Sequence, residues 1–167
     1  MFKNIHWRHY LKFAIGAAGA YAIPATIYLL KANYTQSWLL YLGNFLFLLV
    51  IIASLVSFNN HRKKDASAVS MVIAGHITTV TGIVLACLLS FILILILVPG
   101  YLGTAKNLMS HVPANTVRDK THGMSFMLFF NAVVGNMSMG SASSIIFPFS
   151  LKRDQTTEKV PPKQAEL

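Results

Sequence analysis

Residues 61–99 read HRKKDASAVSMVIAGHITTVTGIVLACLLSFILILILVP, which is a basic cluster followed by a long apolar run. The run from 69 to 98 contains no Asp, Glu, Lys or Arg. About 18 consecutive apolar residues are enough for a membrane-spanning helix. Basic residues beside a span mark its cytoplasmic end. The stretch therefore predicts a span over 69–98 that begins on the cytoplasmic side.

The composition is that of a membrane protein. Of the 167 residues, 54% are hydrophobic and only 11% are charged, against roughly 25% charged in ordinary soluble domains. The net charge is +9, but the basic residues lie in short flanks between apolar runs. Flanking Lys and Arg hold helix ends at a lipid surface, so we exclude nucleic acid as a partner and expect the lipid bilayer instead.

Three further apolar runs accompany this span, at residues 13–30, 38–58 and 124–149. We therefore predict an all-α fold, an integral membrane four-helix bundle formed by residues 1–150. The last 17 residues, 151–167, are polar and contain Pro161-Pro162. Such a segment has too little apolar surface to fold alone, so we expect a disordered cytoplasmic tail.

The basic residues are distributed unequally between the two sides of this bundle. The N-terminal flank, the 59–68 loop and the tail together hold ten Lys and Arg, whereas the 31–37 and 99–123 loops hold four. The side with more Lys and Arg is the cytoplasmic one. Both termini are therefore predicted to be cytoplasmic.

Small and polar residues recur at helical spacing in three of the spans. Small residues on one face let two helices approach closely in lipid, where packing drives association. We expect helix-packing roles for Gly16, Ala20, Gly75, Thr79, Gly82, Ala86, Asn131, Gly135 and Ser138.

The fourth span carries a second small and polar set on a roughly opposite face: Asn136, Gly140, Ser143 and Ser144. An unpaired polar group in hydrocarbon is costly. We expect the set with Asn131 to pack inside the chain, near Gly75, and the second set to meet another copy or another membrane protein.

The residues that membrane chemistry requires are missing from the spans. All five acidic residues lie outside them, whereas proton-coupled transport and cation selection often use buried carboxylates. His76 is the one histidine near a span, and we expect a hydrogen bond to a neighbour or water rather than a relay or ligand role. Copper binding by the soft thioethers of Met124, Met127, Met137 and Met139 is conceivable, but packing is the better interpretation. We expect no enzyme activity, no cofactor and no metal.

The layout resembles small, uncharacterised four-span membrane proteins of Bacteroidota-type bacteria. The similarity lies in a basic loop after the second span, here Asn60-His61-Arg62-Lys63-Lys64-Asp65, followed by a third span with Ser and Gly and a long outer loop. The resemblance implies a bacterial inner membrane as the location and assigns no residue a role.

Three classes of function are considered, of which a membrane enzyme or metal binder is disfavoured because the spans contain no carboxylate. Two functions remain. The first is a non-enzymatic accessory or interaction protein that assembles through its small-residue helix faces. The alternative is a subunit of an oligomeric transporter or channel, because four spans without a buried charge leave little room for a pathway in one copy.

The topology is testable with reporter fusions. Fusions at Gln36 and Ala114 are expected to report the outside, and fusions after Leu151 the inside, because the excess of basic residues orients the spans. Activity of a cytoplasm-only reporter at Ala114 would contradict the predicted topology.

Overall fold

The computed structural model describes residues 7–31, 33–61, 67–98 and 123–157, and this part of the chain contains helices and no strand. The first three helices are α1 (Trp7–Lys31), α2 (Trp38–His61) and α3 (Ala68–Leu97), with a short 3-10 turn, η1 (Tyr34–Gln36), between α1 and α2. The all-α prediction is confirmed.

Within the described residues, α1, α2 and α3 are each long and apolar enough to cross a membrane. The predicted third span, 69–98, matches α3 to within one residue at each end. Three helices of this length and hydropathy are typical of an integral membrane protein.

Local side chains set several helix ends. Ser67 precedes α3, and its Oγ accepts a hydrogen bond from the Ser70 backbone N–H at 3.1 Å. A serine at this position satisfies one of the free N–H groups of a first turn. In the connection before α2, the Asn33 side chain accepts from the Thr35 N–H at 3.0 Å, as asparagines in turns do.

The fourth helix, by which we mean residues 123–157, has three parts. Residues 123–130 are helical, η2 (Asn131–Gly135) is a π-helical turn, and α5 (Asn136–Thr157) continues to the end of the described chain. The structure thus differs from the expected disorder of the tail, because the helix includes residues 151–157. That segment is polar, yet it contains helix formers and no proline. The remaining tail, residues 158–167, and the loop 99–122 lie outside the described residues.

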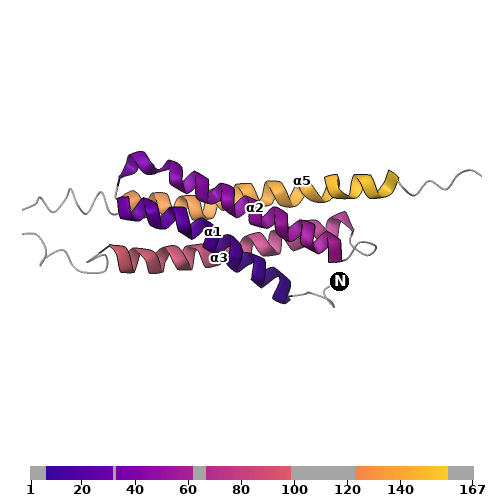
Figure 1. Ribbon diagram of the computed structural model, residues 1–167, viewed down its shortest axis with the longest axis horizontal. Coiled ribbons are helices and arrows are strands. Elements are labelled where there is room, and N and C mark those ends of the chain that lie inside the picture. Colours follow the sequence, from indigo (N-terminus) through magenta and orange to yellow (C-terminus); the bar gives the residue numbers. More distant parts are fainter. Residues whose placement is uncertain (1–6, 32, 62–66, 99–122, 158–167) are drawn as a thin grey trace, which may run out of the picture.

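The helices form a bundle in which neighbours are not simply consecutive in the chain. Both α1 and α5 pack against α2 and against α3 (Figure 1). In this arrangement α1 runs parallel to α3, and α2 runs parallel to α5 (Figure 1). The fourth helix therefore has two neighbours, α2 and α3, which lie in different directions from its axis.

Alanine and tyrosine form the buried face of α1. Its fully buried residues include Ala14, Ala17, Ala18, Tyr21, Ala25 and Tyr28. The predicted packing residues of this helix are more peripheral, because Ala20 is half-buried and Gly16 is exposed, although a Cβ added at Gly16 would lie 3.6 Å from the Val50 side chain of α2. The spacing of the buried set shows the reason: the packed face also includes two large tyrosines, which a search for small residues overlooks.

Tyr21 shows how closely these helices approach. Its ring lies against Gly43 of α2, where an added Cβ would be 3.0 Å from the ring. Its hydroxyl donates to the backbone carbonyl of Leu128 in the fourth helix at 2.9 Å. A single buried side chain therefore links α1, α2 and the fourth helix.

Candidate functional site at the wide turn of the fourth helix

The π-helical turn η2 interrupts the regular hydrogen bonding of the fourth helix. The N–H of Asn136 bonds to the carbonyl of Asn131, five residues earlier. Such turns insert one extra residue into an α-helix and often occur at functional sites. Two tyrosines of α1 contact the helical turn before η2. Tyr21 donates a hydrogen bond to the Leu128 carbonyl, and the Tyr28 hydroxyl lies 3.9 Å from the Met127 sulfur.

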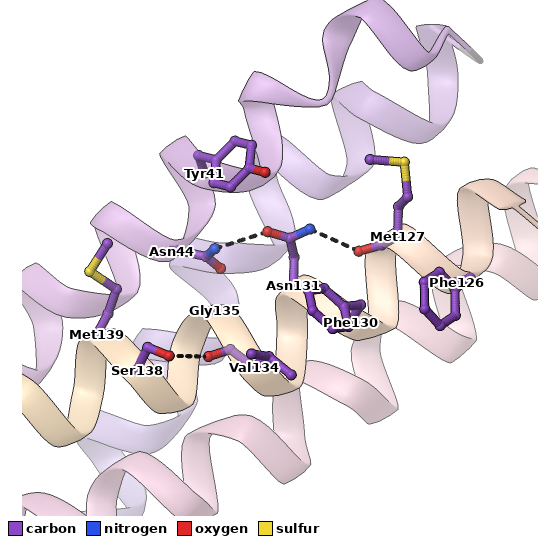
Figure 2. A pocket seen from close by; sticks show the side chains of 10 residues that line it. All are labelled: Tyr41, Asn44, Phe126, Met127, Phe130, Asn131, Val134, Gly135, Ser138 and Met139. Carbon is purple, nitrogen blue, oxygen red and sulfur yellow. Dashed lines mark hydrogen bonds between the residues drawn. The ribbon is translucent and has the colours of Figure 1, made fainter.

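Two asparagines join α2 to this turn. Asn44 and Asn131 are only 2% and 7% exposed. Asn44 Nδ2 donates to Asn131 Oδ1 at 3.2 Å, and Asn131 Nδ2 donates to the Met127 carbonyl at 3.0 Å (Figure 2). Since Asn131 uses its amide nitrogen on a carbonyl, its oxygen must be the acceptor, which fixes the orientation of Asn44. The Oδ1 of Asn44 is left buried with no hydrogen-bond partner among the described residues.

The second small and polar set faces α3, not the outside. Asn136 and Ser144 are fully buried. A Cβ added at Gly140 would lie within 3.0 Å of the Thr79 side chain, and one added at Gly75 would lie 2.8 Å from Ser144 Cβ. Ser143, a fourth member of the set, is also buried. This corrects the expectation that Asn136, Gly140, Ser143 and Ser144 meet another copy or protein.

The first set also differs from its expected position. Asn131 and Gly135 pack against Asn44 of α2 rather than near Gly75 of α3, and Ser138 is exposed. The wide turn explains both differences. One extra residue rotates everything after it by roughly 100° about the helix axis. Ser138 is thereby turned out of the bundle, and the set with Gly140 is turned onto α3.

A groove lies between α2 and the fourth helix, beside the asparagine pair. Its volume is about 380 Å³, and it is lined by Tyr41, Asn44, Phe126, Met127, Phe130, Asn131, Val134, Gly135, Ser138 and Met139. Figure 2 shows the two asparagines between the helices and the aromatic and methionine side chains around them. The rings of Phe126 and Phe130 are stacked, with centroids 5.8 Å apart. We call this site the asparagine groove.

The groove lies near the end of the bundle where α2 begins. Asn44 follows Trp38 by six residues, which is roughly 9 Å along the helix axis. Trp38 and Tyr41 are both exposed on α2. Exposed Trp and Tyr near a helix end are typical of the membrane–water interface.

The other predicted residues have ordinary surroundings. His76 Nδ1 lies 2.9 Å from the Val72 carbonyl, one turn earlier in α3. Gly82 and Ala86 are buried, and a Cβ at Gly82 would be 3.0 Å from the Phe47 ring of α2. Of the four methionines, Met124 is buried whereas Met137 and Met139 are exposed.

Sequence reasoning missed the contribution of α2 to the site. The second span was predicted only as an apolar run over 38–58, yet Asn44 lies within it beside Gly43. A single asparagine inside an apolar span is itself a signal, because its amide needs a partner in hydrocarbon. The aromatic lining residues Tyr41, Phe126 and Phe130 carried no comparable signal.

Comparisons with protein-family models, with curated proteins and with solved structures give no match to this chain.

The contact between Gly140 and Thr79 is testable by substitution. Gly140→Leu is expected to lower the free energy of unfolding by about 1–3 kcal/mol, because the added side chain overpacks the α3 contact. Reversible unfolding of the purified chain in mixed micelles measures the change. Gly19→Leu is the control, since a Cβ there would meet nothing within 4 Å. A Gly140→Leu chain as stable as the control would show that this contact is not close.

Proposed function

We propose that this chain is a non-enzymatic protein of a bacterial inner membrane that binds another membrane component in the asparagine groove. In this proposal the fourth helix is the fourth span, and both termini lie in the cytoplasm. The excess of basic residues in the predicted cytoplasmic segments supports the orientation. The groove would then open in the outer half of the bilayer.

The observation that carries the proposal is the combination of polar and apolar groups in this groove. Its wall includes Tyr41, Phe126 and Phe130, which are all exposed, whereas Asn44 and Asn131 lie buried beside them. Ligand sites are mostly apolar hollows of about 300–1,000 Å³ that hold a few fixed polar groups. The volume of about 380 Å³ falls in that range.

The inventory of side chains supports binding rather than catalysis. No acidic residue lies in the predicted spans, and the described residues contain no group of three or more His, Cys, Asp or Glu placed to hold a metal ion. The serines of the fourth helix instead donate to backbone carbonyls, as Ser143 and Ser144 do to Gly140. Such bonds hold a helix together and activate no nucleophile.

One observation favours the alternative, a subunit of an oligomeric transporter or channel. Buried polar atoms without a partner in the described structure recur along the bundle, among them Thr79 Oγ1, Ser90 Oγ and Asn136 Oδ1. Buried polar atoms of this kind are usually hydrogen-bonded to water. A hydrated interior is what a route for a small neutral solute requires.

Capture at the groove tests the main proposal. A small diazirine amino acid at Val134, which lines the groove and is 44% exposed, is expected to form one discrete adduct in native membranes. The same amino acid at Val133, which is 46% exposed but outside the groove, is the control. We expect it to react only with bulk lipid. Equal adducts at the two positions, analysed by mass spectrometry, would contradict binding in the groove.

Solute flux separates the two functions. The purified chain in sealed liposomes is expected to leave the efflux of small neutral solutes at the level of empty liposomes, because the described core is filled by side chains such as Tyr21 and Phe47. Flux that grows with the amount of protein would favour the transporter or channel subunit.

A further inference from the structure

The asparagine groove has an unmet requirement for a hydrogen-bond donor. Asn44 uses Nδ2 on Asn131, and its Oδ1 is buried without a partner among the described residues. Two neighbouring donors are already used, because Asn131 Nδ2 bonds to Met127 and the Ser138 hydroxyl donates to the Val134 carbonyl at 2.8 Å. A buried acceptor without a donor is costly in hydrocarbon. A ligand that enters this groove is therefore favoured if it carries an O–H or N–H.

The lining also indicates the charge of the ligand. The ten lining residues include no Lys, Arg, Asp or Glu. A phosphate or a quaternary ammonium buried there would find no opposite charge, and the burial of an unpaired charge is strongly unfavourable. The polar part of the ligand is thus expected to be uncharged.

The apolar lining of the groove suits a hydrocarbon chain, which is thin and flexible. The stacked rings of Phe126 and Phe130 offer it a flat apolar wall.

The depth of Asn44 fits a lipid as well. It lies one turn beyond Tyr41, an exposed aromatic residue near the start of α2. Aromatic residues of this kind lie at headgroup level. An acceptor one turn deeper, roughly 5 Å along the helix axis, is at the level where the hydroxyl of a lipid with a small uncharged headgroup lies.

We propose that the asparagine groove binds an uncharged, hydroxyl-bearing lipid of the diacylglycerol class. The hydroxyl donates to Asn44 Oδ1, and one acyl chain lies along Phe126, Phe130 and Met139. This inference rests on the proposed function and names the component that the groove holds.

The experiment uses the full chain in phosphatidylcholine vesicles that contain a diacylglycerol with a diazirine in one acyl chain. Illumination is expected to label the segment from Phe126 to Met139, as located by mass spectrometry. Unlabelled diacylglycerol is expected to compete. Its methyl ether, which lacks the donor, should compete about fivefold to tenfold less well, since one hydrogen bond is lost. Equal competition by the methyl ether, or by added phosphatidylcholine, would overturn the proposal.

Matched variants test the residues. Met139→Trp fills the groove and is expected to reduce labelling at least fivefold. Met137→Trp is the control and is expected to leave labelling unchanged, because Met137 is similarly exposed but does not line the groove. Asn44→Leu is expected to abolish the preference for diacylglycerol over its methyl ether. Asn59→Leu on the same helix should retain it, although Asn59 is also buried with an unpaired Oδ1. If both leucine variants retain the preference, Asn44 is not the acceptor.

The outcomes separate this inference from the proposed function. A discrete protein adduct at Val134 in native membranes, with no selective diacylglycerol labelling, would overturn the lipid inference and leave binding in the groove in place. The absence of any groove-specific adduct in both experiments would overturn both proposals.

Discussion

A single helix in this bundle has to satisfy two sets of polar contacts in two directions, and the wide turn η2 makes that possible. In a regular helix, the five steps from Asn131 to Asn136 place these two side chains roughly 140° apart. A helix at the corner of a bundle meets two neighbours at a smaller angle, about 90° in a square arrangement. The extra residue of the turn reduces the separation, so that Asn131 meets α2 while Gly140 and Ser144 meet α3 and Asn136 is buried.

The sequence predicts most of this architecture and little of the site. The runs that became α1, α2 and α3 are long, apolar and free of acidic residues, so their number follows from composition alone. Their ends follow approximately, except that α1 begins at Trp7 rather than at residue 13. The small and polar residues of α3 and the fourth helix were also recognised. The neighbours of these residues were not predicted correctly. A regular α-helix turns by 100° per residue, whereas the segment Asn131–Gly135 is a wider π-helical turn. No residue in that segment is a recognisable sequence signal for a π-helical turn.

One feature of the sequence did contain a clue to the turn. Two polar faces on nearly opposite sides of one helix are difficult to satisfy inside a four-helix bundle, which offers neighbours on adjacent sides. An outer partner for the second face was one solution, and a local change in helical winding is the other. The burial of Asn136 and the close contacts at Gly140 show that the chain adopts the second solution. The exposed surface of the fourth helix is mainly apolar, with Ile145, Ile146 and Phe149 among its residues.

The same turn connects the packing of the bundle to the groove. It brings Gly135 against the carboxamide of Asn44, where a side chain would collide, and it turns Ser138 outward to the groove. Interhelical hydrogen bonds in membranes are modest, about 0.6 kcal/mol on average, so the single Asn44–Asn131 bond does not by itself explain two buried asparagines. The pair fixes the orientation of Asn44 and leaves its oxygen without a donor. An acceptor held in place in this way is a cost to the isolated chain unless water or a ligand supplies the donor.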